Sequence, residues 1–453
     1  MDKSEFKVLV PTGMLGYGFP LEWYLKGLER KPDIISVDAG STDSGPQKLA
    51  LGEMTCTEEA YATEIELLVE TGKKHNIPVF ISSAGGDGTS QHVDFFVELT
   101  KNAAKKLGLS LRIGVMYAEI DKELVKNRLQ AGRVKPCGYV PELTEKDIDD
   151  ATVIVAQMGA EPYIKAMDEH GPLDIIISGR SYDPAPMAAM AIRAGFDPAL
   201  AWHMAKIAEC GAQCAEPMCK TLLATIRKDH FTVEAMDPAG KCKTYSVAAH
   251  TLYEKSHPYI LKGPGGTLNL KDCVFEQVDD RICKVSGSQF IPDEHYAVKL
   301  EGACVVGYRS ICVAGTRDPL MIATIDSTLE AVRNTVRETL PEAYAQSELI
   351  FHVYGKDGVM GELEFMRDAV SHELCIIIEV ASPDQKMAKT LCNKARTTLL
   401  HYPYEGRIAT GANIGLPFTP LEIPLGQVCR FNVYHLMEVD DPTEVFPITV
   451  IEV

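Results

Sequence analysis

The sequence lacks the features that mark membrane and exported proteins. None of its apolar runs reaches the roughly 18 residues that a membrane-spanning helix needs. Its first residues, M-D-K-S-E, do not have the form of a signal peptide. We therefore expect a cytoplasmic protein that makes no membrane contact.

Positive charge is also scarce. The 453 residues include 45 Lys and Arg against 63 Asp and Glu, which gives a formal net charge of -18. Nucleic acids and anionic membranes are polyanions and repel such a chain. The composition therefore predicts no nucleic-acid partner.

The cysteines do not form a recognisable metal motif. All 13 are scattered along the chain, and the closest group is Cys210, Cys214 and Cys219. This group has no matching second half such as a C-x-x-C pair, which a zinc site would need. The spacing therefore favours reduced thiols over a zinc site.

Nucleotide-binding motifs are missing as well. The stretch A-G-G-D-G-T-S (84–90) could aim backbone N–H groups at a phosphate, but no G-K-[ST] follows it, so it is not a P-loop. Near the start of the chain, Gly13-x-x-Gly16-x-Gly18 reverses the glycine spacing of dinucleotide-binding folds. The sequence therefore argues against a nicotinamide cofactor, and it predicts no other cofactor with certainty.

What the sequence does contain is a globular composition and a clear alternation of elements. Hydrophobic residues make up 46% and charged residues 24%, and the length exceeds a single core of ordinary size. In the first half, short β-branched runs alternate with helical stretches, which predicts a parallel sheet. We expect a doubly wound, mainly parallel α/β domain over residues 1–220 and an α+β domain over 221–453 that covers the site.

Six strands are predicted in the first domain, and the loops that follow them share a character. The strands are residues 6–10, 34–37, 77–81, 111–116, 152–156 and 173–177, with helices near 21–29, 57–75 and 91–107. Parallel strands deliver their following loops to one rim, where open α/β folds bind ligands. Five of these six loops contain Gly, whereas the connections at the opposite rim are ordinary charged turns. The asymmetry favours a ligand site over turn chemistry alone.

Carboxylates are frequent at this rim. The six that could share it are Asp38, Asp43, Asp87, Glu119, Asp121 and Asp183. Crowded carboxylates raise one another's pKa or recruit a cation, so the group predicts either a general acid/base or a divalent-metal site. Taken singly, any of them could instead cap a helix or face solvent.

Arg180 is the basic residue of the rim loops, in S-G-R-S-Y-D-P directly after the sixth strand. A guanidinium there can hold a substrate carboxylate through two parallel hydrogen bonds. The alternative is an ion pair with Asp183 or with an acid from a neighbouring loop, and both interpretations stay open.

Roles can be assigned to these residues for a reaction beside a carbonyl group. Asp43 or Asp87 is the predicted base, Asp183 the predicted acid and Arg180 the predicted carboxylate anchor. The predicted substrate-binding residues are Asp38, Ser41, Thr42, Gly85, Gly86, Arg180 and Ser181.

The second half has fewer helices between its strands. Strands are predicted at 231–235, 244–249, 303–314, 349–354 and 373–380, and helices at 318–340 and 384–400. This order predicts a mainly antiparallel sheet covered by helices on one side. The stretches 259–268 and 401–418 are rich in Gly and Pro and are predicted as loops, either functional or simply lying along the surface.

With these stretches in view, the sequence resembles the acyclic terpene utilisation family. The motifs that carry the resemblance are D-A-G-S-T-D-S-G-P (38–46), A-G-G-D-G (84–88), S-G-R-S-Y-D-P-A (178–185), E-C-G-A-Q-C (209–214), A-G-T-R-D-P (314–319) and F-N-V-Y-H (431–435). The resemblance implies bacterial catabolism of branched carboxylic acids or their acyl thioesters, with a coenzyme A thioester among the substrates left open. It also implies a small partner protein encoded nearby, and it carries over no catalytic residue.

Two classes of function remain. The first is a catabolic enzyme, a hydro-lyase (hydratase) or isomerase, that acts on a small carboxylic acid or its thioester. The second is a non-catalytic ligand-binding or scaffold subunit that works with the small partner protein. In either case we expect a homo-oligomer.

Overall fold

The computed structural model describes residues 3–252, 257–408 and 411–453, which form two compact units. The first unit comprises Met1–Cys304 and Phe431–Val453, and the second comprises Val305–Arg430. The expected boundary after residue 220 lies inside the first unit, because β8 (Leu222–Arg227) pairs along its whole length with β1 (Glu5–Val10). Within the described ranges, no helix is both long and apolar enough to cross a membrane.

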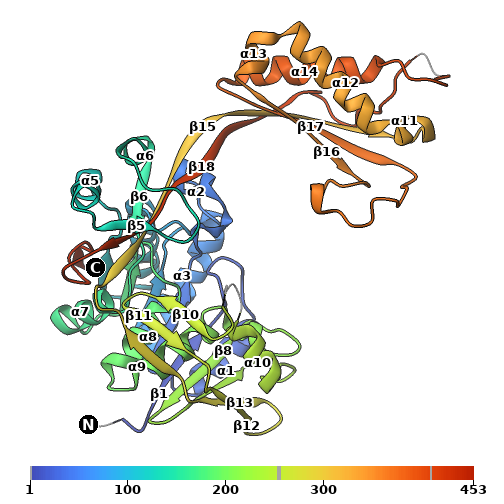
Figure 1. The fold of residues 1–453 in the computed structure, drawn as a ribbon. Helices are drawn as coiled ribbons and strands as arrows, with labels where there is room; N and C mark the ends of the chain where they lie inside the picture. The colour runs from blue at the N-terminus through green and yellow to red at the C-terminus, as the bar shows by residue number, and fades with distance from the viewer. Residues whose placement is uncertain (1–2, 253–256, 409–410) are drawn as a thin grey trace. The chain divides into compact units, whose positions relative to one another are not determined.

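A mixed sheet forms the centre of the first unit (Figure 1). Its strand order is β12-β13-β9-β8-β1-β2-β3-β7-β4-β19. The middle strands β1, β2 (Ile34–Asp38), β3 (Val79–Ser82), β7 (Ile175–Ser178) and β4 (Arg112–Met116) are parallel neighbours. Antiparallel strands extend both edges: β8, β9 (Phe231–Ala235), β13 (Ile282–Ser286) and β12 (Val274–Gln277) on one side and β19 (Ile448–Glu452) on the other.

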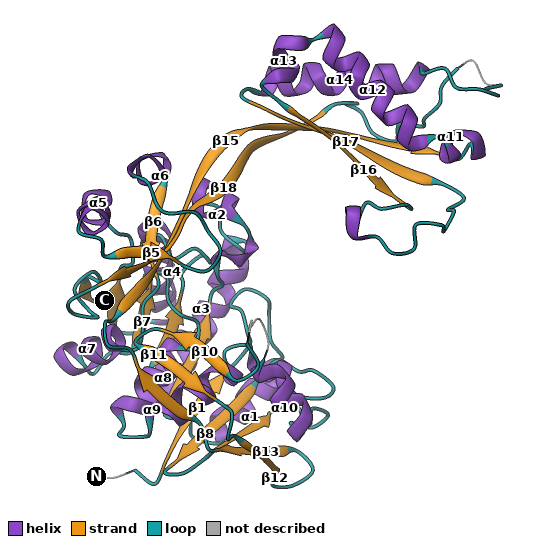
Figure 2. Ribbon diagram, in the orientation of Figure 1, coloured by secondary structure: helices purple, strands orange, loops and turns teal. Residues whose placement is uncertain are grey.

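Helices cover both faces of this sheet. Successive residues of β1 point to opposite faces, so Leu9 packs in one core while Val8 and Val10 pack in another. The first core includes α1 (Leu21–Glu29), α3 (Glu58–His75) and α4 (Ser90–Leu107). The second includes α7 (Glu161–His170), α8 (Ala185–Arg193) and α9 (Pro198–Ala208). Figure 2 shows these helices around the strands.

The shorter elements of the first unit complete the chain order. They are α2 (Pro46–Leu51), α5 (Lys122–Gln130), β5 (Val134–Pro136), α6 (Glu145–Asp150), β6 (Val153–Ala156), α10 (Thr244–Thr251), β10 (Ile260–Gly263), β11 (Gly266–Asn269) and β14 (Gln289–Pro292).

Three expectations about single elements are wrong. The strand at 152–156 exists as β6, but it pairs antiparallel with β15 (Ala297–Thr316) and not with the parallel strands. Residues 244–249 form helix α10 and not a strand, because Val247 and Thr251 are spaced by four and are both buried. The stretch 259–268 is the hairpin β10–β11, whose Pro264-Gly265 turn retains the expected turn chemistry.

The second unit is an antiparallel sheet with helices on one face (Figure 1). The strand order is β16 (Glu348–Tyr354), β17 (Leu374–Ser382), β15 and β18 (Ile423–Glu438). The helices are α11 (Pro319–Ala323), α12 (Ile325–Thr339), α13 (Pro341–Ala345) and α14 (Gln385–His401). Alternate residues of β17 are buried against α12 and α14, as a half-buried strand requires. With β17 inserted between β15 and β16, the element order is a split β-α-β arrangement.

Candidate functional site

The loops after β2, β3 and β7 lie side by side at the carboxyl ends of these parallel strands, a region called the rim below. The Ser83 N–H donates to the Gly179 carbonyl at 3.2 Å, and the Arg180 N–H donates to the Gly88 carbonyl at 3.2 Å. The Ser82 hydroxyl donates to Asp38 at 2.6 Å. Residues from three separate parts of the chain therefore form one connected group.

Arg180 is the centre of this group. Its side chain is only 2% exposed, and its Nε donates to Glu301 Oε2 at 2.7 Å. Its Nη1 donates to the Ser181 carbonyl at 2.7 Å and to Asp183 Oδ1 at 3.1 Å. The ion pair with Asp183 weighed from the sequence is present, but the shorter contact is with Glu301.

Glu301 lies on β15 and forms an ion pair with a second cation. Lys299 Nζ lies 2.7 Å from its Oε1. Burial alone would raise the pKa of Glu301, but the charges of Arg180 and Lys299 hold it at about 2. Burial would likewise lower the pKa of Arg180, yet the neighbouring carboxylates, Glu301 first, raise it. The buried pair is therefore ionised on both sides.

Asp38 is a rim carboxyl group whose pKa is raised. Burial raises its pKa well above the usual range, and the Asp183 charge raises it further. Hydrogen bonds from Ser82 and the Gly40 N–H and the charge of Arg180 oppose this rise without cancelling it. A buried carboxyl group with a raised pKa, close to a second carboxyl group and a guanidinium, is an arrangement typical of acid/base sites.

Hydroxyl groups extend this cluster into the sheet. Tyr163 Oη lies 2.5 Å from Ser178 Oγ and 2.7 Å from Ser181 Oγ. Ser83 Oγ accepts from the Ser181 N–H at 3.3 Å, and Ser83 has a left-handed φ of 50°. A fully buried non-glycine residue in this conformation is strained, which occurs preferentially at functional sites.

Asp87 forms a separate buried pair with His92. Its Oδ1 lies 2.6 Å from His92 Nδ1 and also accepts from the Thr89 N–H at 3.0 Å. His92 Nε2 lies 3.2 Å from the Gly52 carbonyl, which can only accept, so Nε2 carries a hydrogen. Asp87 Oδ2 is buried and has no hydrogen-bond partner among the described residues.

Carboxylates of the chain itself already accept hydrogen bonds from backbone N–H groups of the glycine-rich loops and the start of α4. Glu64 accepts from the N–H groups of Gly16 at 2.8 Å and Gly18 at 2.7 Å. At the start of α4, Asp87 accepts from Thr89, and Glu119 accepts from the Ser90 N–H at 2.7 Å. These donors are the ones that a phosphate would use, so the geometry gives no support to a nucleotide site.

The remaining predicted site residues lie as follows. Asp43 is exposed in the 3-10 turn Thr42–Ser44, where its N–H donates to Ser41 Oγ at 3.2 Å, and Thr42 is buried. Asp121 caps α5 through the N–H groups of Glu123 and Leu124. Gly85 and Gly86 have φ of 71° and 106°, which only glycine adopts easily. The structure therefore groups Asp38, Arg180, Ser181 and Asp183, while Asp43 stands outside the buried cluster.

The hairpin β10–β11 borders the rim. A Cβ atom added at Gly263 would lie 3.1 Å from the Tyr182 ring, next to Asp183 in sequence. In the part of the chain that the structure describes, no three His, Cys, Asp or Glu side chains are grouped as metal ligands.

Several members of the cluster were not identified from the sequence. Glu301 and Lys299 lie in the long strand β15, and Glu301 is 121 residues from Arg180 along the chain. No motif in the neighbouring sequence marks either residue. Tyr163 and His92 lie on helices whose periodicity indicates only core packing. Ser82 and Ser83, in contrast, directly precede the predicted A-G-G-D-G loop and could have been included with it.

Comparison with known proteins places the chain in a family. A family model described as "Acyclic terpene utilisation family protein AtuA" matches residues 47–415. The chain belongs to the acyclic terpene utilisation family. The resemblance inferred from its motifs is thereby confirmed. No curated protein and no solved structure matches the chain.

The range matched to the acyclic terpene utilisation family includes most of the rim. Asp87, Arg180, Asp183 and Glu301 lie within it, whereas Asp38 and the whole D-A-G-S-T-D-S-G-P stretch (38–46) precede it.

Proposed function

We propose that this member of the acyclic terpene utilisation family is a catabolic enzyme with its active site at the rim of the first unit. It acts on a small branched carboxylic acid or its acyl thioester and adds or removes water, or moves a double bond. Both reactions need proton transfers, and the neighbouring carboxyl groups of the rim supply them.

The observation that carries this proposal is the burial of Asp38 at the rim, where it is 7% exposed and accepts hydrogen bonds from Ser82 and the Gly40 N–H. Because its pKa is raised by burial and by Asp183, Asp38 is the rim acid best suited to keep a proton near neutral pH and donate it. Asp183 is 31% exposed and Asp38 is 7% exposed, so Asp183 is the more accessible of these two carboxyl groups. We assign proton donation to a leaving hydroxyl to Asp38 and proton abstraction beside the carbonyl to Asp183.

In this scheme Arg180 positions the two carboxyl groups and presents a positive field to the substrate. Its Nη1 holds Asp183 directly, and Glu301 fixes its Nε. The strained Ser83 and the Tyr163 hydroxyl support the loop that carries Ser181. A site held by buried charged pairs is preorganised, which is where electrostatic catalysis gains most.

A second candidate is a ligand-binding or scaffold subunit that works with a small partner protein. The burial of Arg180 favours it, because a guanidinium that is 2% exposed and bound to Glu301, Asp183 and Ser181 has little capacity left for a substrate. In that case the cluster stabilises the fold, and binding takes place without turnover.

The test is a proton-exchange assay on the whole chain. The purified protein is incubated in D2O with a panel of branched hydroxy and unsaturated acids and their coenzyme A thioesters, and deuterium beside the carbonyl is measured by mass spectrometry. Asp183→Asn should reduce exchange at least about a hundredfold, and Asp38→Asn should reduce the loss of water from the hydroxy acids, measured in the same spectra, by a similar factor, the usual contribution of a general base or acid. Asp43→Asn is the matched control, because Asp43 is exposed.

Wild-type exchange in Asp183→Asn together with wild-type loss of water in Asp38→Asn would remove the rim from the mechanism. Saturable binding of a panel member with no exchange in any protein would establish the second candidate.

A further inference from the structure

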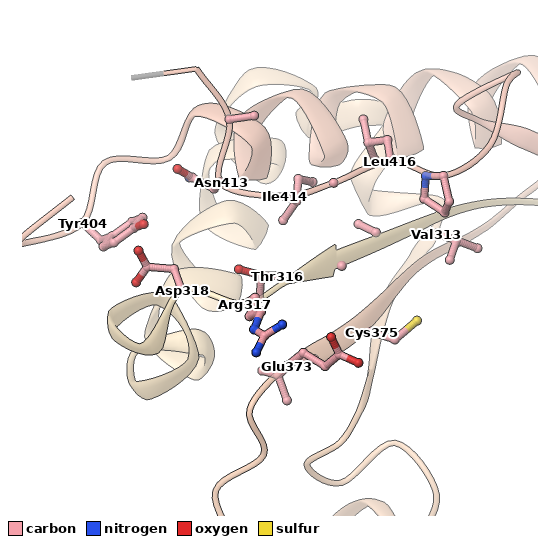
Figure 3. A pocket seen from close by; sticks show the side chains of 16 residues that line it. Val313, Thr316, Arg317, Asp318, Glu373, Cys375, Tyr404, Asn413, Ile414 and Leu416 are labelled. Atoms are coloured by element: carbon pink, nitrogen blue, oxygen red, sulfur yellow. The ribbon is translucent and has the colours of Figure 1, made fainter. Parts of the chain in front are cut away.

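The second unit contains a pocket that the rim chemistry does not use (Figure 3). It has a volume of about 810 Å³ and lies where β15 ends, between the start of β17 and residues 412–417. Two of the sequence stretches singled out above meet here, A-G-T-R-D-P (314–319) and the Gly- and Pro-rich 401–418, of which 409 and 410 lie outside the described residues. Its volume is within the range of small-molecule sites.

Two glycines leave room for an occupant. Gly315 and Gly415 face each other across a pair of backbone hydrogen bonds of 2.9 and 2.8 Å. Neither has a left-handed φ, so the backbone conformation does not require glycine there. A Cβ atom at either position would meet nothing closer than 3.7 Å. Glycine inside a strand pair weakens it, and a common reason for its presence is the close approach of a ligand.

Two polar groups in the lining are buried without a partner. Thr316 Oγ1 and Asn413 Oδ1 have no hydrogen-bond partner among the described residues, and their residues are 6% and 8% exposed. The Asn413 amide is oriented by its nitrogen, which donates to the Leu399 and Tyr402 carbonyls at 2.9 and 2.7 Å. Its oxygen is therefore an acceptor of fixed direction. Native proteins leave few such groups unsatisfied, so each needs a partner from the pocket, either a water molecule or a ligand.

The rest of the lining defines the chemistry of that partner. Val313, Leu374, Ile414 and Leu416 provide apolar walls. The charged residues of the lining are two acids, Asp318 and Glu373, and one base, Arg317. Figure 3 shows Asp318 beside Tyr404 and Arg317 near Glu373. Acceptor oxygens thus dominate over donors, and an anion would meet two carboxylates. The lining fits an uncharged molecule that donates hydrogen bonds.

We propose that this pocket is a second ligand site, independent of the rim, which binds a small organic molecule with an apolar body and a hydroxyl or amide hydrogen-bond donor. The donor group binds Asn413 Oδ1 and Thr316 Oγ1, and the apolar body lies over the two glycines.

The test uses three probes with the same branched five-carbon body: 3-methylbutan-1-ol, 3-methylbutanamide and 3-methylbutanoate. Binding to the whole chain is measured by ligand-observed NMR titration. Protection of the Cys375 thiol from iodoacetamide, measured by peptide mass spectrometry, locates the bound probe, because Cys375 lines the pocket. Comparing the alcohol with the amide distinguishes a hydroxyl donor from an amide donor. The carboxylate, which can only accept hydrogen bonds, is the control.

Thr316→Val is the decisive variant. Valine has the shape of threonine, and the lost hydroxyl has no partner in the described protein, so the melting temperature should not fall. Affinity for the alcohol or the amide should fall about tenfold, the usual effect of one lost hydrogen bond. Thr316→Ser should restore binding, and Thr339→Val, in an exposed position on α12, should change nothing.

Three results would overturn the proposal. They are unchanged affinity in Thr316→Val, binding of the carboxylate as tight as that of the amide, and no saturable binding or Cys375 protection with either donor probe. None of these results bears on the rim, because Thr316 and Cys375 belong to the second unit and the rim to the first.

Discussion

Replacing Glu301 with Gln should strongly destabilise the first unit. The substitution keeps the size of the side chain but removes the charge that Arg180 and Lys299 share. In the folded chain these cations hold the pKa of Glu301 at about 2, against 4.5 for an unperturbed glutamate. The difference between these two pKa values corresponds to roughly 3 kcal/mol of stabilisation of the ionised form. Breaking a buried pair by removing one partner costs about 3–5 kcal/mol, which agrees with this value.

The pH dependence follows from the direction of the shift. A folded-state pKa below the unfolded value means that Glu301 stabilises the fold fully above about pH 4.5 and loses this contribution as the pH falls toward 2. The difference between wild type and Glu301→Gln should therefore be largest at neutral pH and shrink below pH 4.5.

Urea unfolding followed by tryptophan fluorescence measures this difference. Both tryptophans, Trp23 and Trp202, lie in the first unit, so the signal reports that unit. Glu66→Gln is the control, because Glu66 pairs with Lys106 at 2.7 Å on the surface, where a pair is worth about 0–1 kcal/mol. A loss in Glu301→Gln no larger than in Glu66→Gln would refute the reasoning that the buried charges hold the rim together.

Three further predictions concern the rim. Arg180→Lys should lower the free energy of unfolding by more than about 1 kcal/mol. Arg180 binds Glu301 through Nε and Asp183 through Nη1, whereas Lys has a single side-chain nitrogen. An unchanged melting curve would contradict this prediction. Asp38→Asn should flatten the decline of stability with pH. The folded-state pKa of Asp38 is raised, so wild type loses stability as the pH rises from the usual value of 3.8 through the folded-state pKa, and an equal slope in both proteins at all pH values above 3.8 would contradict this. Gly88→Ala should destabilise the fold far more than Gly108→Ala in thermal melts. Both glycines have φ near 66°, but a Cβ atom at Gly88 would lie 2.0 Å from the Arg180 backbone nitrogen, whereas one at Gly108 would meet nothing within 4 Å.

The local pattern predicted most elements of the first unit. The helices α1, α3 and α4 lie where their periodicity indicated, and β1, β2, β3, β4 and β7 coincide with their apolar runs within a few residues. Strand type and helix periodicity depend on neighbouring residues, which a sequence displays directly. The pairing of β6 with β15 involves residues about 150 positions apart and has no such signal.

In the candidate site, too, some features could be predicted from the sequence and others could not. Asp38, Arg180 and Asp183 follow strands of one parallel group, so their proximity could be predicted from strand order. The isolation of Asp43 could not, because a side chain in a turn can point in several directions. Whether a carboxylate caps a helix, as Glu119 and Asp121 do, is also decided by backbone geometry.

The sequence by itself determined that the chain alternates strands and helices, that glycine-rich and acidic loops follow the parallel strands, and that it belongs to the acyclic terpene utilisation family. Only the tertiary structure decided the electrostatics. Glu301 pairs with both Arg180 and Lys299 because the pairing of β15 with β6 brings it there, and the pKa of Asp38 is raised because folding removes it from water beside Asp183. Desolvation and Coulomb energies depend on distances in space, and no property of a single residue or of its neighbours in sequence contains them.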